Sequence, residues 1–214
     1  MLKPLLTSAM LFAATAPAAA HEIWIERDAT GPARIYFGEP AADVAEPGEP
    51  DAAQLKKPLI FLSDRTKPIA ARLVGDHLDA EAPGSADLRL YDTSAFDPWD
   101  HDGVKNAAIF HAREGRRETV AKLDFEIVPL AADADRFRVQ FQGKPMPSTA
   151  VTVIAPGKWQ KTLRTDDQGI VAVPNKGAGR YIIVASHGED AKMDVGGVTA
   201  EKLHHVTTLS YRTN

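Results

Sequence analysis

The sequence predicts an all-β protein built from β-sandwich domains. Short runs of β-branched, aromatic and other apolar residues recur along the chain, separated by turns rich in Gly, Pro, Asn and Asp. No heptad pattern, long amphipathic helix or internal repeat interrupts this series. Short strands and turn signals at this spacing are typical of a β-sandwich.

Residues 1–20 have the features of a cleaved secretory signal peptide. Lys3 supplies the positive n-region, residues 5–16 form a short apolar h-region, and residues 18–20 are three alanines at the expected cleavage point. The apolar run is too short to cross a bilayer, and no later stretch approaches about 18 apolar residues. We therefore expect an exported, soluble product, with an uncleaved anchor as the alternative.

Cleavage after Ala20 would make His21 the first residue of the mature chain. Its α-amine, with an ordinary pKa of about 7.7–8.0, and its imidazole, of about 6.5, can both be unprotonated near neutral pH. Nitrogen donors of this kind suit copper, nickel, cobalt or zinc. With a third nitrogen from elsewhere, the arrangement is a histidine brace. The alternative is that His21 merely follows the cleavage site and lies in solvent.

The first half of the mature chain, residues 21–128, is predicted to form the N-terminal sandwich. Residues 22–26 alternate strictly, with Ile23 and Ile25 on one face. A strand that starts directly after His21 would hold the chain end in place. The remaining expected elements are strands at 33–38, 58–62, 87–91, 107–111 and 118–128, and an exposed loop at 40–54 with a helical turn near 51–55.

The second half, residues 136–214, is predicted to form another sandwich after a short polar linker at 129–135. Phe137, Val139 and Phe141 alternate with polar residues, as in a half-buried strand. Turn signals then separate further expected strands at 150–154, 170–173, 181–187 and 203–211.

The segment HEIWIE at residues 21–26 resembles the opening of domain-of-unknown-function family 4198. Members are exported bacterial proteins, some of them associated with periplasmic nickel or cobalt uptake. The later segments GKPMPSTAVTVIAP, TDDQGIVAVP, GRYIIVASH and HHVTTLSY are similar to the second half of that family, which resembles transthyretin-like and carboxypeptidase-regulatory sandwiches. Residues 40–122 match loosely. The resemblance implies two Ig-like or transthyretin-like domains, no catalysis and a role in handling a transition metal.

The best partners for a metal site on His21 are His187 and His205, because the family-like segments carry histidines at these places. His187 ends one expected strand and His205 lies within the last, so a returning connection could bring them together. The alternative for His205 is a core histidine bonded to the backbone. His204 and Glu22 are further candidates for the site, and Glu22 or Glu189 could supply an oxygen ligand or fix an imidazole tautomer.

The sequence gives little support for a calcium site, a catalytic site or a nucleic-acid-binding site. The loop DPWDHDG at residues 97–103 fails the calcium-loop pattern and is expected to be an acidic surface turn. There is no nucleophile elbow, P-loop or dinucleotide fingerprint. A copper oxidase acting on polysaccharides would need a flat aromatic face, and three Trp and four Tyr supply little for one. The absence of cysteine excludes disulfides and thiolate sites, and a net charge of −4 argues against nucleic-acid binding. We do not expect an enzyme.

The sequence therefore predicts a periplasmic accessory protein that binds a transition metal for uptake or buffering, through His21, His187 and His205. Its partner would be an inner-membrane metal transporter or reductase. Ligand softness favours copper(II) or nickel(II), the resemblance favours nickel or cobalt, and iron and zinc are further candidates. The alternative is a metal-free module that docks on a transporter, receptor or enzyme through its sheet edges or through the 40–54 loop.

Overall fold

The computed structural model describes residues 21–28, 30–42 and 51–214; the expected signal peptide and residues 43–50 of the expected loop lie outside this part of the chain. The regular secondary structure of the described chain is β-strand apart from two 3-10 turns, at Ala52–Gln54 (η1) and Pro156–Lys158 (η2). The predicted all-β class and the predicted helical turn near residues 51–55 are confirmed. The strands are β1 (Glu22–Glu26), β2 (Ala33–Gly38), β3 (Leu59–Phe61), β4 (Ala71–Val74), β5 (His77–Ala80), β6 (Leu88–Asp92), β7 (Trp99–His101), β8 (Val104–Glu114), β9 (Phe125–Pro129), β10 (Arg136–Phe141), β11 (Lys144–Pro145), β12 (Ala150–Ala155), β13 (Trp159–Arg164), β14 (Ile170–Ala172), β15 (Gly179–Glu189), β16 (Met193–Val195), β17 (Val198–Ala200) and β18 (Lys202–Thr213).

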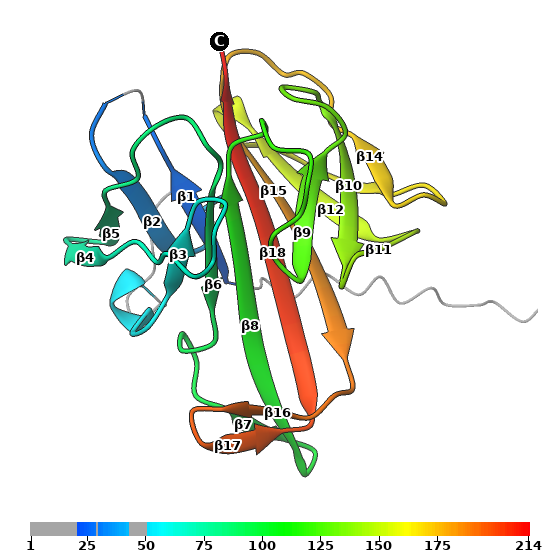
Figure 1. Cartoon of the computed structure of the whole chain (residues 1–214). Helices are drawn as coiled ribbons and strands as arrows, with labels where there is room; N and C mark the ends of the chain where they lie inside the picture. The colour runs from blue at the N-terminus through cyan, green and yellow to red at the C-terminus, as the bar shows by residue number, and fades with distance from the viewer. Residues whose placement is uncertain (1–20, 29, 43–50) are drawn as a thin grey trace, which may run out of the picture.

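One large central sheet runs through both halves of the chain. Its strand order is β13-β12-β15-β18-β8-β6-β3, and β7 pairs with the far end of β8. The last strand, β18, pairs in parallel with β8 over residues 202–210 and 106–114, and Figure 1 shows these two long strands side by side in the middle of the molecule. The two expected sandwiches are therefore not confirmed as separate units, because strands of both share this sheet.

A second sheet, in the order β1-β2-β5-β4, covers one face of the central sheet. Its inward side chains, such as Ile23 and Phe37, pack against Phe110 of β8 and against Ile182 and Val206 from the second half of the chain. This hydrophobic core thus joins residues from both predicted domains.

A third sheet covers the opposite face of β12, β15 and β18. It consists of β10, paired on one side with β9 and on the other with β11 and β14. Phe137 and Val139 of β10 pack there against Ile183 of β15 and Leu209 of β18. Strands β15 and β18 are therefore covered on both faces, which explains the unbroken apolar run at residues 181–185, since a strand buried on both sides cannot alternate.

Two hydroxyl groups in the buried strand β18 attach β1 to the central sheet. The hydroxyl of Thr208 donates to the carbonyl of Ile23 at 2.6 Å, and that of Ser210 donates to the carbonyl of Ile25. These carbonyls lie on β1, an end strand of the second sheet, so the two hydroxyls tie the backbone of this strand to the central sheet.

Residues 118–124 do not form the first part of the strand predicted over 118–128; β9 begins at Phe125. Their backbone groups bond instead to buried ionic side chains. The carbonyls of Glu118 and Val120 accept from arginines of the central sheet, and the amide of Leu123 donates to the carboxylate of Glu126 at 2.8 Å. This segment therefore wraps around a buried charge cluster, which sequence alternation cannot anticipate.

The hairpin of β16 and β17 closes one end of the molecule (Figure 1). Val195 and Ala200 of the hairpin pack on Ile109 and Leu203 of the central sheet, which forms a third small core. Between this hairpin and the third sheet lies a short strip of the central sheet on which His187 and Glu189 are partly exposed.

Candidate functional site

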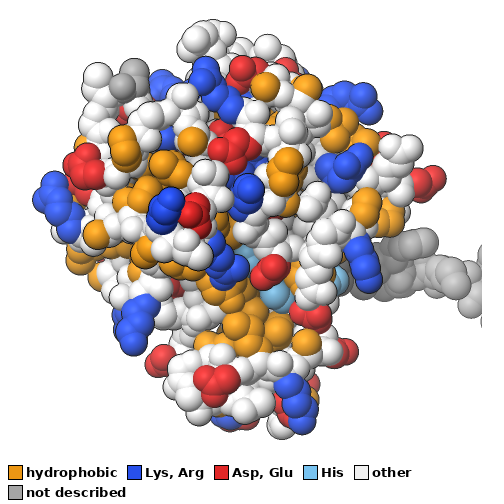
Figure 2. Space-filling view, in the orientation of Figure 1, with side chains coloured by type: hydrophobic (Ala, Val, Ile, Leu, Met, Phe, Trp, Pro, Cys, Tyr) orange, Lys and Arg blue, Asp and Glu red, His pale blue; other side chains and the backbone are white. Residues whose placement is uncertain are grey.

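Histidine side chains gather on the strip between the third sheet and the hairpin. His187 of β15 and His205 of β18 are directly opposite each other across the paired strands, with ring centroids 6.4 Å apart. The ring of Phe141 packs against both, with centroid distances of 4.7 and 4.9 Å. Figure 2 shows histidine side chains reaching the surface of this face beside a hydrophobic area. The structure therefore brings together two of the three predicted ligands.

His111 of β8 is the third histidine of this cluster. Its Nε2 lies 3.3 Å from Nδ1 of His205, and its side chain is 1% exposed. The parallel pairing of β8 with β18 puts residues 109, 111 and 113 on the same face as residues 205, 207 and 209. Sequence reasoning missed His111 because this pairing joins segments 94 residues apart.

Glu189 completes the group at its solvent side. It lies two residues beyond His187 on the same face of β15, and its Oε2 is 3.3 Å from Nε2 of His205. Gln142 holds the other oxygen, with its Nε2 donating to Glu189 Oε1 at 3.4 Å. Within the described residues, His205 Nε2 and His111 Nδ1 are buried and have no hydrogen bond of acceptable geometry. His205 was expected either as a ligand or as a core histidine bonded to the backbone; its partners are side chains.

Both inner imidazoles favour the neutral form. Burial, together with the nearby ring of His205, lowers the pKa of His111 to about 3. Burial also lowers the pKa of His205, and this effect outweighs the opposing influence of Glu189. The neutral form of an imidazole has a free lone pair on one nitrogen, and this is the form that binds transition metals.

His21 lies on the other side of the central sheet. Its ring packs against Phe37, with centroids 6.1 Å apart, and Phe37 packs in turn against Phe110. Phe110 belongs to the core beneath the second sheet, whereas His187 and His205 face the third sheet. The structure does not bring His21 to the other two predicted ligands, because strand alternation separates the faces of a sheet.

His204 also points away from the cluster. Its Nε2 lies 2.7 Å from Oδ1 of Asn106, and its ring stacks on Trp99 with centroids 5.5 Å apart. His204 and His205 are neighbours in the chain, so their side chains leave β18 on opposite faces. His204 therefore packs against β7 and does not contribute to the histidine cluster.

Within the described residues, His77, His101 and the acidic loop belong to no group of three possible metal ligands. His77 lies on the second sheet, with its Nδ1 2.8 Å from Asp76 Oδ1 and its Nε2 3.2 Å from Asp79 Oδ1. His101 is 75% exposed in its side chain and lies 3.6 Å from Asp102 in the turn between β7 and β8. The segment at 97–103 thus includes the exposed strand β7 and a tight turn, as its expected surface position implies.

Glu22 of β1 gives the protein a testable pH dependence. Burial, and secondarily the nearby carboxylate of Glu39, raises the pKa of Glu22 to about 8 from its ordinary 4.5. Between these values the folded chain holds a proton that the unfolded chain has lost, so stability falls as pH rises through the window. We expect Glu22→Gln to remove a dependence of up to about 1.4 kcal/mol per pH unit.

Urea unfolding at about pH 5 and about pH 7.5 measures this effect. Glu81→Gln is the control, since that side chain is exposed. A difference between the two pH values that is the same in the wild type and in Glu22→Gln would contradict the assignment.

Comparisons with known proteins add no relative: no family model, curated protein or solved structure matches this chain. In residues 21–28, 30–42 and 51–214, no three His, Asp or Glu side chains already have the arrangement of a metal site. Over the same residues, no helix is both long and apolar enough to cross a membrane.

Proposed function

We propose that this protein is an exported, periplasmic accessory protein that binds a divalent transition metal on its histidine face. The ligands are His187, His205 and Glu189. One observation carries the proposal: His187 and His205 are paired across β15 and β18, and the buried Nε2 of His205 faces the Glu189 carboxylate without a hydrogen bond.

The donor set suits a borderline metal ion. Two imidazole nitrogens and one carboxylate oxygen are ligands for nickel, copper, cobalt or zinc. Donors at ligand distances of about 2.0–2.1 Å from one tetrahedral ion lie roughly 3.3 Å apart, and His205 Nε2 and Glu189 Oε2 are separated by 3.3 Å. Small rotations of the partly exposed His187 and Glu189 side chains would bring all three donor atoms within ligand distance of one ion.

His111 acts as a positioning residue for this site. A hydrogen on Nδ1 of His205 can be donated to Nε2 of His111, 3.3 Å away, which leaves the lone pair on His205 Nε2 for a metal. Such an outer hydrogen bond sets the tautomer and orientation of a ligand imidazole. The low pKa of His111 keeps it neutral and able to accept.

Titration of the mature protein with nickel(II), copper(II) and zinc(II) tests the site. We expect His187→Ala and His205→Ala each to weaken binding at least tenfold, because each removes one of three ligands. The matched control is His101→Ala, whose imidazole is exposed on the far turn. A variant with one residue added before His21 is expected to bind as the wild type does, because His21 lies on the other face.

Two results would reject the proposal. Equal affinity of the wild type and the His187→Ala/His205→Ala double variant would leave the metal-free docking module as the better function. Loss of binding only in the variant extended before His21 would instead return the site to the chain terminus. Circular dichroism of each variant confirms that the fold is intact.

A further inference from the structure

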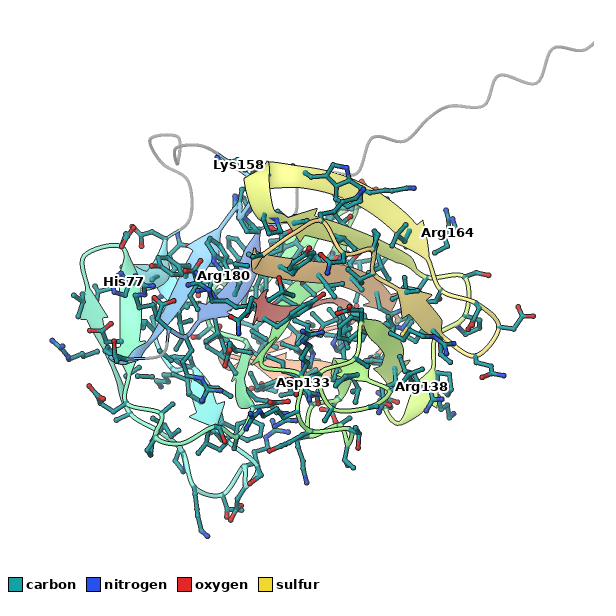
Figure 3. The ribbon with its side chains drawn as sticks, turned by 90° about the horizontal axis from the view of Figure 1, so that it is seen from above. His77, Asp133, Arg138, Lys158, Arg164 and Arg180 are labelled. Carbon is teal, nitrogen blue, oxygen red and sulfur yellow. The ribbon has the colours of Figure 1, made fainter. Side chains whose placement is uncertain are left out.

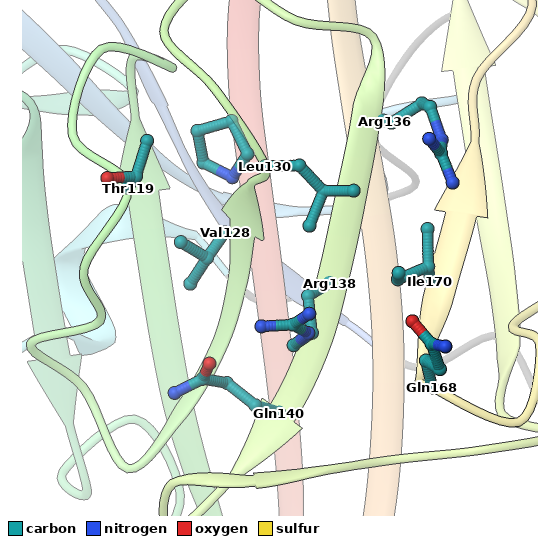
Figure 4. Close-up of a pocket in the computed structure, with 9 residues that line it drawn as sticks. Thr119, Val128, Leu130, Arg136, Arg138, Gln140, Gln168 and Ile170 are labelled. Carbon is teal, nitrogen blue, oxygen red and sulfur yellow. The ribbon is translucent and has the colours of Figure 1, made fainter.

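A pocket of about 420 Å³ lies on the outer face of the third sheet, away from the histidine cluster. Strand β10 alternates, so Phe137, Val139 and Phe141 face the core while Arg136, Arg138 and Gln140 face outward. The neighbouring strands and loops supply the rest of the lining, namely Thr119, Val128, Pro129, Leu130, Gln168 and Ile170. Figure 4 shows Arg138 in the middle of this group.

Among the residues that the structure describes, no acidic side chain pairs with the two arginines of the pocket. Neither Arg136 nor Arg138 has an ion pair or a side-chain hydrogen bond with any described residue. Nε of Arg138 is buried and has no acceptor among those residues. A buried donor without a partner costs free energy, so a ligand that supplies an acceptor gains by binding there.

Apolar side chains flank this guanidinium in a pocket whose exposed lining is mainly polar. Arg138 is directly opposite Val128 on one side and Ile170 on the other, and both of these side chains are buried, with 4% and 8% exposed. Gln140 and Gln168 add amide groups at the rim. A guanidinium fork flanked by apolar side chains matches a planar carboxylate that is attached to a short hydrocarbon chain.

We infer that this pocket binds a small organic carboxylate, with the carboxylate on Arg138 and Arg136 and the hydrocarbon part on Val128, Leu130 and Ile170. The volume is within the range of small-molecule sites. This inference uses no residue of the proposed metal site, so either can fail without the other.

Isothermal titration of the mature protein with hexanoate, hexanamide and inorganic phosphate tests the inference. We expect hexanoate to bind saturably, with hexanamide at least tenfold weaker because it lacks the charge. We also expect phosphate to bind at least tenfold more weakly, because it lacks the hydrocarbon part. Arg138→Gln is expected to weaken hexanoate binding at least tenfold, and Arg138→Lys less, since it keeps the charge but loses the fork.

Arg164→Gln is the matched control. Arg164 is an exposed arginine on β13 of the central sheet, and Figure 3 shows it well away from Arg138. We expect it to bind hexanoate within twofold of the wild type. The inference is overturned if hexanoate fails to bind the folded wild type, if hexanamide or phosphate binds as tightly as hexanoate, or if Arg138→Gln and Arg164→Gln bind hexanoate equally well.

Discussion

Replacement of Glu126 by alanine is expected to lower the free energy of unfolding by about 3–5 kcal/mol, because it leaves two buried guanidinium groups without their shared carboxylate. Oε1 of Glu126 accepts from Nε of Arg89 at 2.9 Å and from a terminal nitrogen of Arg113 at 2.8 Å. Oε2 accepts from the backbone amides of Lys122 and Leu123. All three charged side chains are fully buried.

Urea unfolding followed by circular dichroism measures the loss. Glu118→Ala is the matched control: its carboxylate also bonds to Arg89, at 2.9 Å, but its side chain is 26% exposed. Removal of this partly solvated partner should cost less than removal of Glu126, because Arg89 keeps its buried bond to Glu126. A loss for Glu126→Ala no larger than that for Glu118→Ala would mean that the buried cluster is not held together by this carboxylate.

The second large effect is expected from Ile182→Ala, which should lower the free energy of unfolding by about 2–5 kcal/mol. Ile182 belongs to β15 in the second half of the chain, yet it packs in the core with Ile23, Ile35 and Phe110 of the first half. The cavity left by the substitution therefore weakens the contact between the two halves. We expect β1 and β2 to lose protection together with β15.

Amide hydrogen exchange measured on peptides from each half separates the two outcomes. Val198→Ala is the control, since its side chain is 38% exposed on the hairpin and its loss should change stability by less than about 0.5 kcal/mol. If Ile182→Ala raised exchange only in residues 136–214, the halves would be independent domains after all, as the sequence predicted.

His205 shows which parts of the proposed metal site can be predicted from the sequence and which cannot. Alternation correctly groups His205 with Leu203, Thr207 and Leu209 on one face of β18. It does not show that His111 lies on the same face of a neighbouring strand, because the two segments are far apart in the chain. Glu189 could be suggested as an oxygen ligand from its closeness to His187, and the structure does place it beside His205.

The pocket on the third sheet could not be predicted from the sequence either, because its lining comes from segments that are separate in the chain. Arg136, Arg138 and Gln140 are visible in the sequence as the polar side of an alternating strand, which is normally a solvated surface. Only the pairing of the flanking strands places Val128 and Ile170 beside Arg138. Only the folded chain shows that this guanidinium has no acidic partner among the described residues.

The sequence by itself determined the all-β class and most of the strands, because alternation and turn residues act over a few neighbouring positions. Tertiary structure alone decided that β8 and β18 are adjacent, that the central sheet crosses both halves, and that His21 is on the opposite face from His187 and His205. These outcomes depend on which distant strands bury each other's apolar faces. A local pattern of apolar residues indicates that one face of a strand must be buried, but it does not indicate which distant strand buries that face.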